Sequence, residues 1–396
     1  MNKKIKLVPT AVSIGLVMAI TACDDKSPTA DTEKNVTSAD GIGVNIGGNA
    51  AVGTGAAYNT SDIDTKAELS NSAVATDNVK VAADNNNQIL NIGIGASVVA
   101  NTSANRNISG DIEFNLADNT IDNDVTARVE GSTIFANENV VVDANGHEKL
   151  TNFIGGLGIN FSGTQQFAQV AAGAGVGLNT ITSDVAAEVI GSDVIALGNG
   201  SAYEVKEYNE NTAADKEGEI DAGTIKNLNG LIVNAKGDHD LWNLVLNTGI
   251  IVSGSGSTIR PNLNVAVAKN NIAGSTNAIV EDTNVNAFYN SAYTGTDTPK
   301  DVYVNAYDDT DITNNDICIA GSPDLGETKV GITAGAAGST NDVTRNVSAA
   351  VTSKAKTSVN AENLKVKALS HSDIYTADAG VAVDITPSGT AQLTNS

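Results

Sequence analysis

The sequence has few of the residues that usually fill a globular core or bind nucleic acid. Aromatic residues make up 4% of its 396 residues, with a single tryptophan. Lysine and arginine number 23 against 46 acidic residues, which gives a formal net charge of −23. Nucleic acids and anionic membrane surfaces require clustered basic residues, so we expect neither as a partner. Small and β-branched residues are abundant instead, and they suit a narrow core of repeated layers.

Cysteine is scarce as well, since the chain has only Cys23 and Cys318. Two cysteines exclude a disulfide framework. Cys318 lies in the apolar run ICIA, and we expect it to be a small buried residue of a strand.

The first residues, MNKKIKLVPTAVSIGLVMAITAC, combine an early lysine cluster, a short apolar stretch and small residues before Cys23. This segment resembles a bacterial lipoprotein signal peptide, which implies cleavage of residues 1–22 and lipidation of Cys23. An ordinary secretory signal with an incidental cysteine is the alternative. A lipid anchor would place the protein in the cell envelope, where we favour the outer membrane or cell surface. Asp24 supports the inner membrane instead, because an aspartate there usually implies retention in enterobacterial lipoproteins.

Residues 23–41 are polar and are expected to form a flexible tether. Residues 42–396 are expected to form one repeat domain, because a segment of about 60 residues recurs along them. The clearest copies begin NTIDNDVTARVEGS and NTITSDVAAEVIGS, and weaker copies precede and follow them. The copies begin at Asn59, Asn119, Asn179, Asn270 and Asn341, so the intervals are 60, 60, 91 and 71 residues. A repeat at a fixed period indicates a solenoid, in which each unit packs against its neighbours.

Within each unit, apolar and polar residues alternate between clusters of asparagine, aspartate, glycine and serine. This pattern is typical of strands and turns, and no helical periodicity is evident after the leader. We predict an all-β chain that forms a parallel β-helix, or β-solenoid, of about five units of roughly 60 residues. Each unit is expected to contain three rungs, which gives a rod on the order of 70 Å at about 4.8 Å per rung. Asparagine and aspartate are expected at the turns.

Two units are longer than the repeat requires. The insertions cover about 198–226 and 289–300, and they contain Tyr203, Tyr208, Tyr289 and Tyr293. Insertions in solenoids form surface loops and often the binding face, so these tyrosines are candidate contact residues. Loops without a partner are the alternative.

The three histidines, His147, His239 and His371, follow the same apolar signature in different units. With three rungs to a unit they would occupy turns about 14 Å or more apart, which is too far to share one metal ion. We therefore predict turn residues and no metal ligands.

Several acidic residues lie in close pairs or triplets, which are Asp62/Asp64, Asp122/Asp124 and Asp308/Asp309/Asp311. They match no calcium-binding loop, so we expect solvated turn carboxylates, with weak Ca²⁺ binding as the alternative. No nucleophile motif is present. We predict no catalytic residues and no cofactor.

The repeat, N-T-I-x-x-D-V-x-A-x-V-x-G-S followed by V-x-V-x-A, resembles the repeats of filamentous haemagglutinin-like adhesins, and in particular of leukotoxin-type filamentous adhesins. The resemblance covers most of residues 42–396 and is clearest at 119–196. It implies a right-handed parallel β-helix displayed on the cell surface for attachment. The chain is much shorter than such adhesins and has a lipobox where they carry a secretion domain.

We therefore expect an adhesin or structural β-solenoid without catalysis, with host or neighbouring-cell proteins or glycans as partners. Open solenoid ends would also allow homo-oligomers. A carbohydrate-active β-helix enzyme is one alternative, although Trp242 is alone and the arginines are scattered. A fragment of a large secreted exoprotein is the other.

Overall fold

The structure is a computed structural model, and it describes residues 32–46, 50–101, 108–163, 166–210, 223–254, 257–286, 300–326, 330–354, 358–385 and 392–395. These residues form strands, turns and connecting segments, so the predicted all-β class is confirmed. Across the described ranges there is no helix of the length and apolarity needed to cross a membrane. Cys23 and the leader, 1–22, lie outside the described residues.

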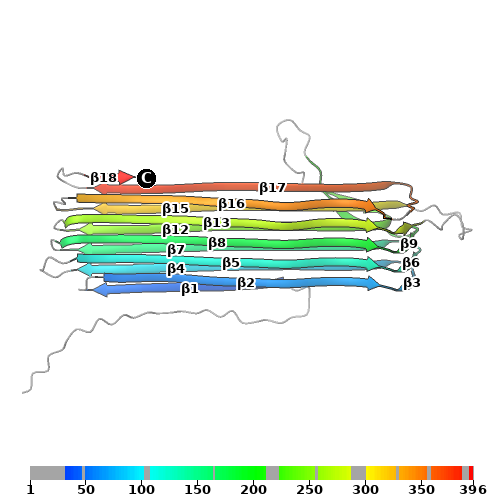
Figure 1. The fold of residues 1–396 in the computed structure, drawn as a ribbon, viewed down its shortest axis with the longest axis horizontal. Coiled ribbons are helices and arrows are strands. Elements are labelled where there is room, and N and C mark those ends of the chain that lie inside the picture. Colours follow the sequence, from blue (N-terminus) through cyan, green and yellow to red (C-terminus); the bar gives the residue numbers. More distant parts are fainter. Residues whose placement is uncertain are drawn as a thin grey trace, which may run out of the picture.

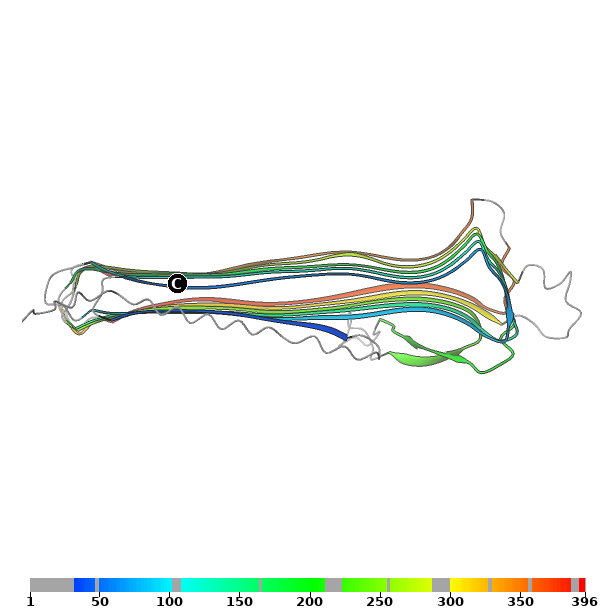
Figure 2. The same ribbon diagram turned by 90° about the horizontal axis from the view of Figure 1, so that it is seen from below.

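Two parallel sheets of long strands face each other and form the body of the molecule (Figures 1 and 2). Sheet A contains, in spatial order, β1 (Thr32–Ile46), β4 (Val79–Asn101), β7 (Val140–Ser162), β12 (Gly230–Ser253), β15 (Asp301–Pro323) and β17 (Leu364–Ile385). Sheet B contains β2 (Ala50–Ser70), β5 (Ile108–Glu130), β8 (Gln166–Ile190), β13 (Ser257–Glu281), β16 (Val330–Thr352) and β18 (Gln392–Asn395). Sheet C is short and connects the two long sheets at one end, with β3 (Ala73–Thr76), β6 (Thr133–Ala136), β9 (Asp193–Ala196) and β14 (Asn284–Val285). Strands within each sheet follow chain order, as in a parallel β-solenoid.

One sequence unit makes one complete coil, which passes through sheet B, sheet C and sheet A in turn. The prediction of three rungs per unit is therefore wrong. The long strands of the central coils contain 23 to 25 residues. At about 3.3 Å per residue each extends roughly 75 Å, whereas neighbouring coils are about 4.8 Å apart. The long dimension thus follows the strands rather than the solenoid axis.

The tether expected at 23–41 is partly a strand. β1 begins at Thr32 and pairs with β4 along its whole length, so residues 32–41 belong to sheet A. Residues 23–31 lie outside the described part of the chain.

The repeat alignment seen in the sequence is the strand register of sheet B. The five asparagines that begin the units are consecutive partners across that sheet, and they are Asn59, Asn119, Asn179, Asn270 and Asn341. Their side-chain amides form a ladder in which successive Nδ2–Oδ1 distances are 2.8, 2.8, 2.8 and 2.7 Å. Opposite them, sheet A contributes a second ladder of Asn91, Asn152, Asn243 and Asn314. Stacked identical amides satisfy one another, so these residues occupy the core rather than the predicted turns.

Each of the first four coils turns the same corner after its sheet B strand. One residue with positive φ lies there in each, namely Asn71, Gly131, Gly191 and Asp282, with φ between 48° and 58°. Glycine, asparagine and aspartate tolerate this left-handed conformation best, which explains the residue types found. A hydroxyl residue follows directly in each coil, and these are Ser72, Ser132, Ser192 and Thr283. The last three hydroxyls each accept a hydrogen bond from the backbone N–H of the preceding coil, as Ser132 does from Ser72 at 3.1 Å.

Apolar side chains fill three layers of the core, and the third contains Ala117, Ile154, Val245 and Cys318. Valines and alanines occupy the end next to sheet C, where Val125, Val142, Val185 and Val233 are fully buried. Further along the strands, isoleucines and leucines from both sheets form a second layer. Cys318 is fully buried in β15, as predicted.

A buried ionic cluster separates the valine and alanine layer from the isoleucine and leucine layer. His239 Nδ1 lies 2.7 Å from Glu148 Oε2, and its Nε2 lies 3.5 Å from Asp308 Oδ2. Arg345 donates to Asp308 at 2.6 Å. Burial alone would lower the pKa of His239, but contacts with Asp308 and Glu148 raise it overall. Protonated His239 and Arg345 then balance the two carboxylates.

Candidate binding site on the outer face of sheet A

The insertion that follows β9 folds back onto the outer face of sheet A. Strands β10 (Tyr203–Glu207) and β11 (Thr224–Leu228) pair as an antiparallel hairpin, which is green in Figure 2 and lies beside one of the two long layers. The hairpin begins in the predicted insertion at 198–226 and extends two residues beyond it, to Leu228. Residues 211–222 of the insertion are outside the described part of the chain. The second predicted insertion, 289–300, lies outside it except for Lys300.

Apolar contacts hold the hairpin against the sheet. Val205 packs against Val141, Ile232 and Tyr303, and each of the four is no more than 4% exposed. Tyr303 and its two neighbours in sheet A point away from the core, on the face that alternation normally leaves polar.

A break in the alternation is the sequence signal for this contact, and none of the predictions above used it. Three consecutive apolar residues occur at 140–142, 231–233 and 302–304, whereas the first and last coils have Lys80 and Lys365 at the central position. Outward apolar residues on three neighbouring coils form a contiguous patch, and a patch of this kind indicates that something covers it.

Polar contacts fix the hairpin in place. The Tyr203 hydroxyl donates to Asp143 Oδ2 at 3.0 Å. Lys365 donates to Glu207 Oε1 at 2.7 Å, and the Tyr303 hydroxyl lies 3.4 Å from Glu207 Oε2. Burial opposes ionisation of Glu207, but the Lys365 hydrogen bond and charge lower its pKa overall. The carboxylate therefore joins the hairpin to strands of two coils.

A cavity of about 180 Å³ remains between the hairpin and the sheet. Tyr208 stacks on Tyr307, with ring centroids 3.9 Å apart and an interplanar angle of 7°. The ammonium groups of Lys206 and Lys236 lie 4.9 and 5.7 Å from the Tyr208 ring. The lining also includes carboxamides and carboxylates, from Asp143, Asn145, Glu204, Asn234 and Asn305. The cavity thus combines an aromatic surface with hydrogen-bond donors and acceptors.

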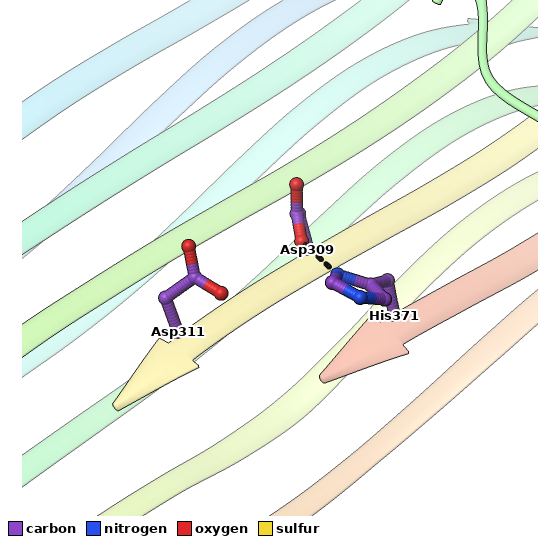
Figure 3. A group of neighbouring side chains, drawn as sticks. All are labelled: Asp309, Asp311 and His371. Carbon is purple, nitrogen blue, oxygen red and sulfur yellow. Dashed lines mark hydrogen bonds and ion pairs between the residues drawn. The ribbon is translucent and has the colours of Figure 1, made fainter. Parts of the chain in front are cut away.

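Two carboxylates and an imidazole gather beside this cavity (Figure 3). Asp309 and Asp311 on β15 and His371 on β17 place their ligand atoms within 4.8 Å of one another. His371 Nδ1 lies 2.9 Å from Asp309 Oδ1, and the Tyr307 hydroxyl donates to Asp309 Oδ2 at 2.8 Å. Tyr307 therefore belongs both to the cavity and to this acidic group. Carboxylate and imidazole donors together suit a divalent transition metal, although Asp309 already has two protein partners.

The four tyrosines predicted as contact residues lie in the two insertions, two in each. Tyr203 and Tyr208 are half-buried against sheet A, and both line the cavity. Tyr289 and Tyr293 lie outside the described residues.

The prediction that the histidines are turn residues is wrong, because all three lie within long strands. His239 points into the core, while His147 and His371 lie on the outer face of sheet A, separated by β12 and β15. Burial raises the pKa of Asp238, but the hydrogen bond with His147 and the positive charge of Lys236 outweigh this effect and lower the pKa to about 2. The error came from the assumption of three rungs per unit, which placed acids and histidines of neighbouring units too far apart to interact.

The acid pairs are also in strands rather than in turns. Asp64, Asp124 and Asp184 are successive partners in sheet B and point outward. Burial and the charges of Asp184 and Asp64 raise the pKa of Asp124. These carboxylates therefore form a column of like charges on the surface.

Comparison of the chain with protein-family models, curated proteins and solved structures gives no match in any of the three.

Proposed function

We propose that this protein is a non-catalytic binding protein of the bacterial cell envelope, in which a lipid-anchored β-solenoid presents sheet A to a partner on another cell. The cavity between hairpin β10–β11 and sheet A carries the proposal, because it is a concave polar site with an aromatic surface. The lipobox at Cys23 and the repeat's resemblance to filamentous adhesins support an envelope location and a role in attachment.

Glycans are the partner class that this cavity suits best. Tyr208 stacks on Tyr307, which is only 3% exposed, so the part of the Tyr208 ring that Tyr307 leaves uncovered is the aromatic surface for the apolar face of a sugar ring. The Asn305 Nδ2 and the Asn234 amide are already paired in a ladder with Asp143, so the Asn305 oxygen is left as an acceptor and the Lys206 and Lys236 ammonium groups supply donors for hydroxyl groups. At about 180 Å³ the cavity is smaller than the roughly 300–1,000 Å³ of most small-molecule pockets, so we expect recognition of a single terminal sugar residue.

The experiment measures binding of the purified protein to an array of immobilised glycans and to whole cells. We expect saturable binding that Tyr208→Ala weakens at least tenfold, because the aromatic surface is lost. Tyr58→Ala is the matched control, since Tyr58 is 70% exposed on sheet B. Equal binding by both variants would exclude the cavity as the binding site. If the unaltered protein bound nothing, a structural role in the envelope would be the better explanation.

One observation favours a carbohydrate-active enzyme as the second candidate. The carboxylates of Asp309 and Asp311 approach the separation of about 5–5.5 Å found in retaining glycosidases. Asp309, however, is held by Tyr307 and His371, and both acids extend from one strand rather than from opposite sides of a cleft. Product release from a polysaccharide panel that disappears in Asp311→Asn would establish the enzyme and reject the binding proposal.

A further inference from the structure

The end of the core farthest from sheet C contains two buried carboxylates. Asp111 and Glu113 point inward from β5 and are 1% and 2% exposed. Ser97 donates to Asp111 Oδ1, and Asn115 donates to Glu113 Oε1 at 2.8 Å. Their other oxygens, Asp111 Oδ2 and Glu113 Oε2, are buried without a hydrogen-bond partner. Among the described residues, no lysine, arginine or histidine forms an ion pair with either acid.

Glycines of the opposite sheet leave room for the two carboxyl groups, and the same sheet contributes a further oxygen. A Cβ on Gly158 would lie 2.7 Å from Asp111 Oδ2, and one on Gly156 would lie 2.5 Å from Glu113 Oε1. Asn247 Oδ1, from the next strand of sheet A, lies 2.6 Å from the same Gly156 position. It is likewise buried without a partner, because Asn247 uses its Nδ2 to donate to the Val265 carbonyl at 3.0 Å. Asn247 Oδ1 therefore lies on the Glu113 side of the core, where Glu113 Oε1 and Asn115 Nδ2 are 2.5 and 2.7 Å from the same Gly156 position.

Asn115 Nδ2 and the Leu157 backbone N–H donate to Glu113. The remaining atoms of the group are oxygens, which carry two formal negative charges and have no compensating cation among the described residues. Leaving carboxylates unpaired in a dry interior is costly, so such groups are paired, protonated or bound to a metal. Carboxylate and carboxamide oxygens are the donors that hard cations prefer, and the absence of nitrogen and sulfur donors disfavours zinc and copper.

We propose that Asp111, Glu113 and Asn247 bind one hard divalent cation, Ca²⁺ in type, inside the solenoid core. The ligands come from β5 of sheet B and β12 of sheet A, so the ion joins the two long sheets at the end that lacks sheet C. This site is separate from the acidic group on the outer face, and it does not depend on the proposed binding function.

The test measures metal content and thermal stability after the purified protein is unfolded and refolded with either CaCl₂ or EDTA. We expect about one tightly held Ca²⁺ per chain and a melting temperature several degrees higher in CaCl₂. The double variant Asp111→Asn/Glu113→Gln should retain no Ca²⁺ and should melt equally in both buffers. Asp122→Asn is the matched control, because Asp122 lies on the same strand and points outward. It should behave like the unaltered protein.

A second variant keeps the test decisive if the double variant fails to fold. Asn247→Asp adds a charge to the site, so the difference in melting temperature between CaCl₂ and EDTA should increase. The proposal would be overturned if the refolded protein contained no metal, melted at the same temperature in CaCl₂ and in EDTA, and became more stable only on acidification. Protons rather than a cation would then keep the acids neutral. Retention of Ca²⁺ by the double variant at the level of the Asp122→Asn control would also overturn it.

Discussion

Single residues in the core of this solenoid are tied to their counterparts in neighbouring coils rather than to sequence neighbours. Asn270 illustrates this, since it donates to Asn314 and Asn341 and accepts from Asn179. A polar side chain in such a place stabilises the fold only while every coil supplies its partner, because an orphaned buried amide costs about 1–3 kcal/mol.

Replacement of Asn270 by alanine should therefore lower the free energy of unfolding by about 2–4 kcal/mol, because several amides lose partners at once. Asn271→Ala, at the adjacent outward and half-buried position, should change it by less than about 1 kcal/mol. Denaturant titration followed by circular dichroism measures both. Similar losses in the two variants would contradict the stabilising role of the ladder.

Asp316 makes the core sensitive to pH. It is fully buried, and burial raises its pKa to about 7, aided by Asp378 and opposed by hydrogen bonds from Asn314 and the backbone of Ala268. Because the folded pKa exceeds the unfolded value, this residue contributes stability that is fully present below about pH 4 and is lost as pH rises through 7.

Asp316→Asn should thus stabilise the protein at pH 8.5 by up to about 4 kcal/mol and have little effect at pH 4. Unfolding experiments at the two pH values measure the difference. An effect of the same size at both would show that the substitution acts through packing and not through charge.

At the scale of elements, the sequence predicted relationships between strands better than their lengths. Alignment of Asn59 with Asn119 and Asn179 is the true register of sheet B, because a repeated unit stacks on itself. Strand length could not be inferred, since alternation with a period of two is the same in one long strand and in three short ones. Polar residues that interrupt the apolar pattern indicated turns, yet many of them pair inside the core.

The candidate site was predictable only in part. Tyr203 and Tyr208 were identified because they lie in an insertion, but Tyr307, on which Tyr208 stacks, lies about 100 residues farther along the chain. Asp111 and Glu113 look like ordinary outward acids in the sequence, because nothing in a single strand shows which of its faces is buried. Those pairings follow from the stacking of coils and the folding back of the hairpin.

The docked hairpin should be separable from the solenoid. Ile232→Lys introduces at the covered position the residue type that the first and last coils have there, and it should undock the hairpin at a cost of about 2–4 kcal/mol. Hydrogen exchange at residues 203–207 should accelerate while exchange in β7 and β12 stays slow. Ile94→Lys, at an outward position of β4 that is 40% exposed, is the control and should leave hairpin exchange unchanged. Loss of protection throughout sheet A would contradict this independence.

The whole molecule should tolerate the removal of one coil but not a shift of register. Deletion of residues 59–118 joins Tyr58 to Asn119 and preserves every ladder above the junction, so we expect a folded protein with a modestly lower melting temperature. Deletion of residues 59–119 removes one residue more, which reverses inward and outward side chains at the junction. We expect that variant to aggregate or to lose the β-type circular dichroism spectrum. Equal behaviour of the two deletions would contradict the one-unit, one-coil arrangement.

The extent of a coil along its strands has a consequence for how such a protein grows. Each added unit of about 60 residues extends the stack of coils by only about 4.8 Å, while the span of the molecule along the strands stays at roughly 75 Å. Each long sheet is therefore a broad face with one dimension set by strand length and the other set by the number of coils. Duplication of a unit enlarges the area of the two broad faces without lengthening their strands, so the span along the strands and the area of the faces are set by independent features of the sequence.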